Sequence, residues 1–523
     1  MKNKNNKRDF LIFFMLFVVL IGLSISSTNR VLAAESVPFP RLEVRPSPED
    51  YLPIPMHIYY CSPSGDNITG DGSMENPWQD LRGADGSIIG GDLIYLRGGT
   101  YPDTTLVNFS YSDNRLQNNG FNGNYIVITN YPGEIARWEN NSAWSLTLDG
   151  DYQVLIGSMV GEEYGIYING GITVRGNNCM VHNVDFEGGA ANGGDKNPAM
   201  VEFIPRDINI TDVILSHNYF HDDIYIPEYS GDWLAAIRSF QNTNLVIEYN
   251  IFENLDNLFR GAIDFKDLAH DNIVRYNKFI SVEKGVSYCT QGDGCDGLLI
   301  YENLMKSVDN PFYFSNDLSP SNPIRFFKNV CLDIGSEFFY YLNSDNQDWS
   351  VHGEFYDNVI DGVGFAVGWA DTSSDPKNLP DFFDYNLWKS PFDMNQPWGD
   401  RGYHSHSVVS ADLGILYDAL SMTAIADSGY AGRFAGRYGG NIGGFEFSEI
   451  TESCSDNIQN QDETGIDCGG VCDACIIPTT YTLTNFISAI TNWLGVGNET
   501  SDVNSDGVVN TRDLGIIMSN ELN

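Results

Sequence analysis

One short pattern decides the fold: an apolar residue, two variable residues, Asn, a variable residue and a second apolar residue. It occurs as LSHNYF (215–220), IEYNIF (247–252), VRYNKF (274–279), IYENLM (300–305), FFKNVC (326–331) and FYDNVI (355–360), after a looser VHNVDF (181–186). From Asn183 onward, the asparagines are 35, 32, 27, 26, 26 and 29 residues apart. Periods of 20–50 residues indicate stacked units. Short β-type runs without helical periodicity separate them, which predicts an all-β chain folded as a parallel β-helix.

The Asn of each repeat has a structural role in this interpretation. Asn tolerates the left-handed backbone that a tight turn between two sheets requires. Its amide can also bond to the equivalent Asn in the coils above and below. The apolar residue two positions later is expected to stack in the core (Phe220, Phe252, Phe279 and Met305). The first coil departs from the pattern, because Asp185 stands at that position and Phe186 follows it.

The segments that flank the repeats carry a resemblance to a known superfold. The opening segments are 58–81 (IYYCSPSGDNITGDGSMENPWQDL), 91–101 (GDLIYLRGGTY) and 125–134 (YIVITNYPGE). The closing segments are 384–388 (DYNLW), 404–407 (HSHS) and 441–447 (NIGGFEF). Over roughly 58–447 the chain resembles secreted right-handed parallel β-helix proteins of the pectin-lyase-like superfold. That superfold includes lyases, hydrolases, epimerases and non-enzymatic surface proteins, so the fold does not settle the function.

Charge and the N-terminus predict a compartment. The 523 residues include 29 Lys plus Arg and 70 Asp plus Glu, a net charge of −41, which argues against a nucleic-acid partner. Residues 1–33 combine a basic start, an apolar run and small residues near Ala33, as in a secretory signal, and 34–57 follow as a linker. We expect a secreted protein, associated with the cell surface or free, without a membrane span after signal cleavage.

Four clustered cysteines mark a small module at 448–479, which resembles a cysteine-rich spacer of modular secreted proteins. In a secreted chain such a cluster predicts disulfides rather than a zinc site (Cys454, Cys468, Cys472 and Cys475). Cys289 and Cys295 bracket a short loop that a local disulfide would close. The remaining cysteines are expected to be buried core thiols (Cys61, Cys179 and Cys331).

The C-terminus carries a calcium motif. Residues 502–513, DVNSDGVVNTRD, match a Ca²⁺-binding loop position by position. The expected ligands are side-chain oxygens and one backbone carbonyl (Asp502, Asn504, Asp506, the carbonyl of Val508, Asn510 and Asp513). Asp at the last position, followed by Leu514, resembles a dockerin repeat, so 480–523 is interpreted as a dockerin-like module. The resemblance implies a cohesin-like partner, although dockerins usually carry two such loops and this chain has one.

The strands between the Asn-bearing segments predict a candidate site. They align as AAIRSF (235–240), GAIDFKD (261–267), GVSYCT (285–290), PFYFSN (311–316), EFFYYLN (337–343) and GFAVGWA (364–370). Strand alternation turns one set inward (Ile237, Phe265, Val286, Phe312 and Phe314). Coils stack about 4.8 Å apart, so Arg238, Asp264 and Lys266 would be neighbours in one outward patch. Tyr313 and Tyr340 follow a few coils further on, and a one-residue slip would reverse every assignment.

This patch suits a polysaccharide lyase. β-Elimination on a uronate needs a base for the proton beside the carboxylate and a positive group for the charge that develops there. Lys266 is the predicted base, with a pKa lowered by Arg238. Arg260 is predicted to bind the carboxylate in a fork, and Asp264 completes the patch. Tyr313 and Tyr340 are expected to stack against sugar faces.

Two other functions stay open. A glycoside hydrolase needs two carboxylates across the scissile bond. The candidates are Asp264 and the acidic residues after Asn218, which would equally suit a calcium site (Asp222, Asp223, Glu228 and Asp232). A non-catalytic surface adhesin would bind glycans without cleaving them. The leading prediction is a secreted enzyme that acts on an extracellular polysaccharide, most simply as a lyase.

Overall fold

A computed structural model defines the fold. It describes residues 39–40, 44–102, 106–107, 111–112, 114–139, 144–188, 199–206, 209–223, 235–256, 261–288, 295–314, 322–336, 339–341, 353–362, 367–369, 382–389, 406–419, 421–426, 430–433, 435–438, 441–445 and 509. The chain divides into two compact units, of which Ser36–Glu446 is the first; the second combines Met1–Glu35 with Phe447–Asn523. The cysteine-rich spacer and the predicted calcium ligands lie outside the described residues. The described sheets all belong to the first unit.

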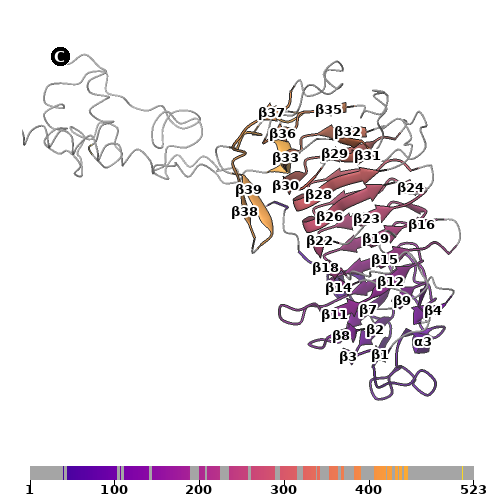
Figure 1. The fold of residues 1–523 in the computed structure, drawn as a ribbon. Coiled ribbons are helices and arrows are strands. Elements are labelled where there is room, and N and C mark those ends of the chain that lie inside the picture. Colours follow the sequence, from indigo (N-terminus) through magenta and orange to yellow (C-terminus); the bar gives the residue numbers. More distant parts are fainter. Residues whose placement is uncertain are drawn as a thin grey trace, which may run out of the picture. The chain divides into compact units, whose positions relative to one another are not determined.

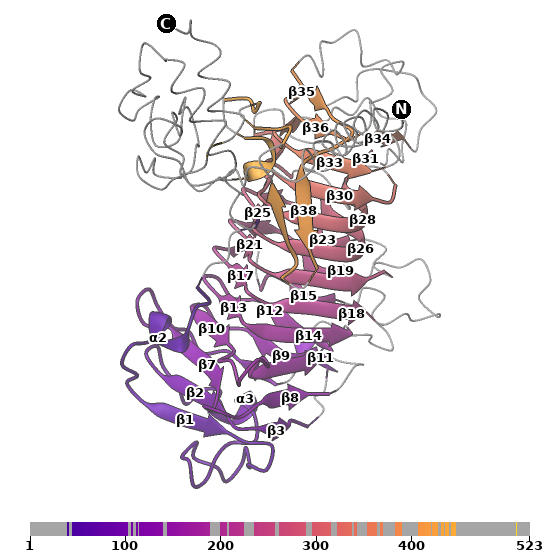
Figure 2. The same cartoon turned by 90° about the vertical axis from the view of Figure 1, so that its left-hand side faces the viewer.

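Each coil of this unit runs through three parallel ladders in turn, and Figures 1 and 2 show the strands stacked in chain order. Ladder 1 is the twelve-stranded sheet. Its strands are β1 (Ile58–Cys61), β2 (Leu93–Leu96), β7 (Ile126–Asn130), β10 (Gln153–Ile156), β13 (Met180–His182), β17 (Ile214–Ser216), β21 (Val246–Glu248), β25 (Ile273–Arg275), β27 (Leu299–Tyr301), β29 (Ile324–Phe327), β32 (Gly353–Tyr356) and β35 (Phe382–Asp384).

Ladders 2 and 3 together form the twenty-stranded sheet. Ladder 2 follows the Asn turn and contains β3 (Gly99–Thr100), β8 (Ala136–Trp138), β11 (Ile166–Asn169), β14 (Val184–Gly188), β18 (Tyr219–Asp223), β22 (Ile251–Leu255), β30 (Val330–Ile334), β33 (Val359–Gly362), β36 (Leu387–Trp388) and β37 (Val408–Val409). Ladder 3 contains β6 (Arg115–Leu116), β9 (Trp144–Leu148), β12 (Gly171–Val174), β15 (Ala199–Phe203), β19 (Ala235–Ser239), β23 (Gly261–Phe265), β31 (Phe339–Tyr341) and β34 (Val367–Trp369). The long strands β26 (Lys278–Tyr288) and β28 (Leu304–Phe314) pass through both ladders. The predicted parallel β-helix is therefore confirmed.

Shorter elements surround the three ladders. They are α2 (Pro48–Tyr51), α3 (Leu81–Ala84), the 3₁₀ turn η4 (Ile442–Gly444), the small parallel sheet of β16 (Ile210–Thr211), β20 (Asn242–Thr243) and β24 (Ala269–His270), and the antiparallel pairs β4 (Leu106–Val107) with β5 (Tyr111–Ser112) and β38 (Ile415–Asp418) with β39 (Thr423–Ala426). The N-terminal segment is tied to ladder 1, because the Tyr51 hydroxyl lies 2.7 Å from His182 Nε2. Nδ1 of this buried histidine lies 2.7 Å from Ser216 Oγ, and burial lowers the His182 pKa to about 3.

One continuous apolar core fills the interior of the coils. Its clearest feature is the predicted aromatic stack. Phe186, Phe220, Phe252 and Phe279 follow one another with ring centroids 4.7–5.0 Å apart and nearly parallel planes. Fully burying one such side chain contributes about 1.5–3 kcal/mol, so each coil stabilises its neighbours through this column.

The predicted asparagine ladder is present and continues one coil beyond the repeated pattern. Each side-chain Nδ2 donates to Oδ1 of the next asparagine at 3.0–3.1 Å, through the series Asn218, Asn250, Asn277, Asn303, Asn329, Asn358 and Asn386. The backbone N–H of each of the first six donates to the same oxygen. All seven are fully buried, so the ladder satisfies polar groups that would otherwise be costly.

The residue that adopts the left-handed backbone is not the one predicted. The residue before each ladder asparagine has a φ of 53–59° (His217, Tyr249, Tyr276, Glu302, Lys328, Asp357 and Tyr385). In the first coil, Asn183 itself has this conformation, and the Val184 N–H donates to Asn218 Oδ1 at 3.0 Å. That coil is therefore shifted by one residue, which is why Phe186 joins the aromatic stack.

The described cysteines match the sequence prediction where they can be compared. Cys61, Cys179 and Cys331 are free thiols buried in the unit. Burial raises the pKa of Cys179 to about 12, as expected of an inert core thiol. Cys295 is disulfide-bonded, and its predicted partner Cys289 lies outside the described residues.

Candidate functional site

The outer face of ladder 3 carries a column of residues in register. The strand pairings align Arg115, Thr147, Thr173, Glu202, Arg238, Asp264, Ser287, Tyr313 and Tyr340. The preceding residues Val201, Ile237 and Ile263 belong to the core, so strand alternation places the column on the opposite face. The register predicted from the sequence for this ladder is correct.

Arg238 lies between two carboxylates of the neighbouring coils. Its Nε is 3.5 Å from Asp264 Oδ2, and its Nη1 is 4.0 Å from Glu202 Oε1. The sequence alignment did not include Glu202, because its strand precedes the regular series. The only signal that identifies it is its register position opposite Arg238.

Lys266 follows Asp264 at the next outward position of the same coil in ladder 3. Its backbone N–H donates to the Ser239 carbonyl at 3.0 Å, which continues the strand pairing by one residue. Its Nζ lies 5.1 Å from the centre of the Phe240 ring, within the range of a cation–π contact. We call Glu202, Arg238, Asp264 and Lys266 the buried quartet.

The buried quartet differs from prediction in its access to solvent. The sequence places Arg238, Asp264 and Lys266 in an outward patch of a ligand groove, and they do lie on the outer face. The exposed fractions of all four members of the quartet are nevertheless only 0–2%. Alternation tells which face a side chain occupies, but it does not tell whether that face is covered.

Burial makes the quartet energetically unusual. Removing an ion from water costs several kcal/mol even after the protein relaxes, and a buried ion pair often stabilises no more than apolar residues of the same volume. Two positive and two negative groups give the quartet a formal charge of zero. Buried ionisable groups that add little to the stability of the fold are candidates for a functional role.

The other predicted residues of this site are only partly described. Tyr313 is in the outer column and nearly buried, and Lys284 Nζ lies 5.7 Å from its ring centre. Tyr340 pairs with Tyr313 in the strand register, but its side chain is outside the described set. Arg260 lies outside the described residues altogether.

A second polar cluster occupies the outer face of ladder 2. We call it the histidine patch, and it consists of Tyr167, Asp185, Glu187, Tyr219, His221, Asp222 and Glu253. His221 Nε2 lies 2.8 Å from Asp185 Oδ1, and its Nδ1 lies 2.9 Å from Asp222 Oδ2. Two tyrosine hydroxyls donate at 2.6 Å to glutamates one coil away, from Tyr167 to Glu187 and from Tyr219 to Glu253.

The electrostatics of the histidine patch favour a charged imidazole. Burial alone would lower the pKa of His221, but hydrogen bonds to Asp185 and Asp222 outweigh it and raise the pKa to about 9. The ring also stacks on Tyr219 at 4.3 Å. No sequence motif marks this patch; only the alignment of ladder 2 brings its members together.

The carboxylates proposed for a hydrolase belong to different networks. Asp222 contacts His221 in ladder 2, whereas Asp264 pairs with Arg238 in ladder 3. Asp223 ends β18, and Glu228 and Asp232 lie outside the described residues. The described part of the chain therefore does not bring the predicted carboxylates Asp222 and Asp264 together.

The described residues also bear on metals and membranes. Among them, no three His, Cys, Asp or Glu side chains are grouped so that they could hold a metal ion. The same residues include no helix long and apolar enough to cross a membrane.

Comparison with known proteins gives fold neighbours and no family. No family model matches the chain, and no curated protein matches it. Solved structures that resemble it include the pectate lyase Pel9A (16% identity, 62% of this chain and 80% of that one, TM-score 0.37) and XylC in complex with xylose (9%, 69% and 88%, 0.43). An alginate lyase from Paenibacillus sp. is a third (13%, 63% and 99%, 0.36). Similarity at this level does not extend to activity.

Proposed function

We propose that this chain is a secreted polysaccharide lyase that cleaves a uronate-containing glycan at the outer face of ladder 3. The observation that carries the proposal is the buried quartet, which sets a lysine and an arginine beside two carboxylates. An amine and a guanidinium on one surface are the groups that β-elimination needs. The quartet is closed to solvent, so the proposal requires this face to open when the glycan binds.

The residues divide the reaction between them. Lys266 is the proposed base: as a free amine it takes the proton from the sugar carbon beside the carboxylate. The electron pair forms a ring double bond and the bond to the glycosidic oxygen breaks. That oxygen gains a proton from water, and the hydroxide left behind takes the proton from the Lys266 ammonium. Arg238 stabilises the charge that develops on the uronate carboxylate. Asp264 and Glu202 position the Arg238 guanidinium.

Calcium belongs to the proposal only through the C-terminal module. The loop 502–513 would hold one Ca²⁺ with oxygen ligands, which suits the chemistry of that ion. In ladder 3, the two described carboxylates lie beside Arg238 and offer no comparable set. No step of the elimination is assigned to a metal, and a cohesin-like partner stays a proposal that rests on the dockerin resemblance.

The test is a glycan screen with two readouts. Polyuronates and neutral glycans are incubated with the full chain, and both ultraviolet absorbance of the unsaturated product and new reducing ends are measured. We expect both signals from a polyuronate. Lys266→Ala should lower the rate at least about 100-fold, the scale of losing a general base.

The matched control is Lys306→Ala, which removes an outward lysine of ladder 2 that pairs with Asp333. It should leave the rate unchanged. Reducing ends without absorbance would identify a hydrolase instead. Binding without either signal would identify the adhesin alternative, and full activity in Lys266→Ala would exclude that residue as the base.

A further inference from the structure

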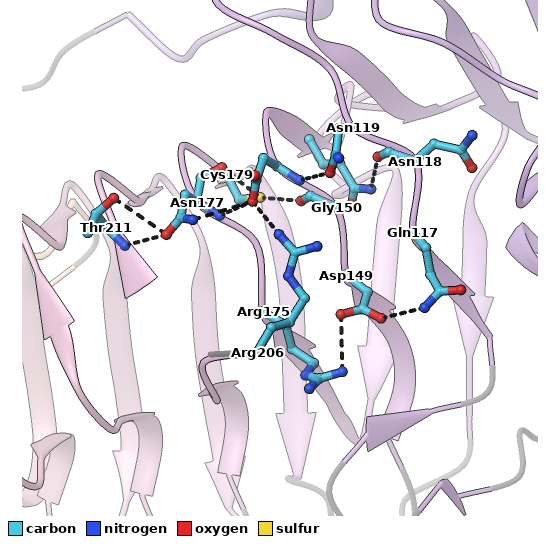
Figure 3. Close-up of polar contacts among 12 residues, drawn as sticks. Gln117, Asn118, Asn119, Asp149, Gly150, Arg175, Asn177, Cys179, Arg206 and Thr211 are labelled. Atoms are coloured by element: carbon cyan, nitrogen blue, oxygen red, sulfur yellow. Dashed lines mark hydrogen bonds and ion pairs between the residues drawn. The ribbon is translucent and has the colours of Figure 1, made fainter. Parts of the chain in front are cut away.

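Three arginines gather at the corner where ladder 3 turns towards ladder 1. Arg175 Nη1 lies 3.1 Å from Asp149 Oδ1, Arg115 Nη1 lies 3.5 Å from Asp149 Oδ2, and Arg206 pairs with Asp151. Figure 3 shows Arg175, Arg206 and Asp149 beside one another. We call Arg115, Arg175 and Arg206 the arginine cluster. With its two aspartates it has a formal charge of +1, in a chain whose net charge is −41.

The backbone beneath the cluster is held by a row of side-chain bonds. The Thr211 N–H donates to Asn177 Oδ1 (Figure 3), the Asn177 N–H to Asp151 Oδ1, and the Asp151 N–H to Asn119 Oδ1, each at 2.9 Å. Asp149 is buried and also accepts from Gln117 Nε2 at 3.2 Å. The arginines therefore project from a fixed corner. Folding has already restricted the backbone that carries them, so less conformational entropy is lost when a ligand binds.

The arginine cluster continues the outer columns of the proposed site. Arg115 lies in the column of Arg238, and Arg175 lies in the column of Lys266, with Ile204 and Phe240 between them. Three coil steps thus separate Arg175 from Lys266, roughly 14 Å at about 4.8 Å per step. One sugar of an extended glycan is about as long as one coil step. A glycan that lies along ladder 3 would place a sugar at Arg175 three units from the one at Lys266.

Unlike the buried quartet, the arginine cluster is open to solvent. The side chains of Arg115, Arg175 and Arg206 are 30%, 15% and 31% exposed. A planar guanidinium matches a carboxylate in a two-bond fork, and it is less strongly hydrated than a lysine ammonium. Three partly exposed guanidiniums at one corner are suited to an anionic sugar and give no advantage to a neutral one.

We infer that Arg115, Arg175 and Arg206 form a subsite that binds the carboxylate of a uronate three sugar units from the cleaved residue. This inference rests on the proposed function for the direction of the glycan along ladder 3. It adds that the substrate is anionic along its length and that the enzyme favours chains long enough to reach the cluster.

The experiment uses Arg206→Gln and Arg175→Gln in the full chain, with oligouronates of increasing length. For oligomers that reach the cluster, we expect kcat/KM to fall about tenfold, the effect of losing one hydrogen bond to a charged group. For shorter oligomers, kcat/KM should stay at the wild-type value. The control is Arg137→Gln, a ladder 2 arginine paired with the exposed Glu163, which should change neither.

Binding separates this inference from the proposed function. Affinity electrophoresis with a polyuronate and with its carboxyl-reduced form needs no cleavage, so it reports on the cluster even if the chain is not a lyase. We expect Arg206→Gln to weaken polyuronate binding and to leave the reduced polymer unaffected. Equal loss at every oligomer length, or unchanged polyuronate binding in both variants, would overturn the subsite. Arg206 and its partner Asp151 are both partly exposed, so this variant tests the idea if Arg175→Gln folds poorly.

Discussion

The buried quartet of ladder 3 and the histidine patch of ladder 2 contain the same kinds of group in different surroundings. Both set a cation between two carboxylates, which come from the coils on either side of Arg238 in the quartet and from one neighbouring coil and its own strand for His221. In the quartet, Arg238 and Asp264 are fully buried, whereas Asp222 of the histidine patch has a 60% exposed side chain. The comparison teaches that neighbouring charges on a β-helix carry different free energies according to whether water reaches them.

The largest expected effect is the loss of one buried partner. Asp264→Ala removes one of the two described carboxylates that flank the buried Arg238 charge. We expect the free energy of unfolding to fall by about 3–5 kcal/mol, the usual cost of breaking a buried pair. Denaturant unfolding followed by circular dichroism measures this. Asp222→Asn in the histidine patch, which removes the exposed carboxylate beside His221, is the matched change and should cost about 1 kcal/mol or less. Equal losses in the two variants would remove the distinction between the regions.

An intermediate effect is expected from pH. The His221 pKa is about 9 in the folded chain and about 6.5 when unfolded, so the folded state holds the proton more tightly. The stabilisation is complete below pH 6.5 and is lost as the pH rises through 9. After solvent screening we expect about 1 kcal/mol. His221→Asn should flatten the stability curve in this window.

A buried histidine supplies the internal control for that measurement. The lowered pKa of His182 makes its contribution fall as the pH drops from 6.5 towards 3, so the two windows do not overlap. The slope below pH 6.5 should persist in His221→Asn. If it disappeared together with the slope above 6.5, the assignment to His221 would be wrong.

The smallest effect is a change with salt. At 1 M ionic strength the Debye length is about 3 Å, so partly exposed pairs are screened and buried ones are not. The contribution of His221 should shrink by a few tenths of a kcal/mol, and the cost of Asp264→Ala should stay the same. Repeating both titrations in high salt tests this. A salt-dependent Asp264→Ala would show that water reaches the quartet.

Periodicity explains what the sequence could predict. The spacing of asparagines from Asn218 to Asn358 implies stacked coils, and stacking with strand alternation is enough to align Arg238 with Asp264 and Tyr313. The sequence predicted that the repeated Asn both forms the ladder bonds and adopts the left-handed backbone, because asparagine is suited to either role. The structure divides the two roles between His217 and Asn218, and the side-chain bonds of the Asn explain why it needs the other backbone conformation.

The remaining errors and omissions concern relations between distant segments. Burial of Lys266 depends on what lies over ladder 3, which no pattern within one strand records. Glu202 meets Arg238, and His221 meets Asp185, through the register of coils more than 30 residues apart. The arginine cluster has the same origin, since Arg115, Arg175 and Arg206 are unremarkable in isolation and meet only at a corner of the folded coil.

The asparagine ladder also bears on how such a chain can change. Successive ladder residues are 32, 27, 26, 26, 29 and 28 positions apart, yet their bonds stay within 0.1 Å of each other in length. Insertions and deletions between two rungs therefore leave the register of the stack untouched. Mutations can therefore change the length of a coil without changing the register between neighbouring coils. Segments beside the proposed site can lengthen or shorten while the columns of ladder 3 keep their order.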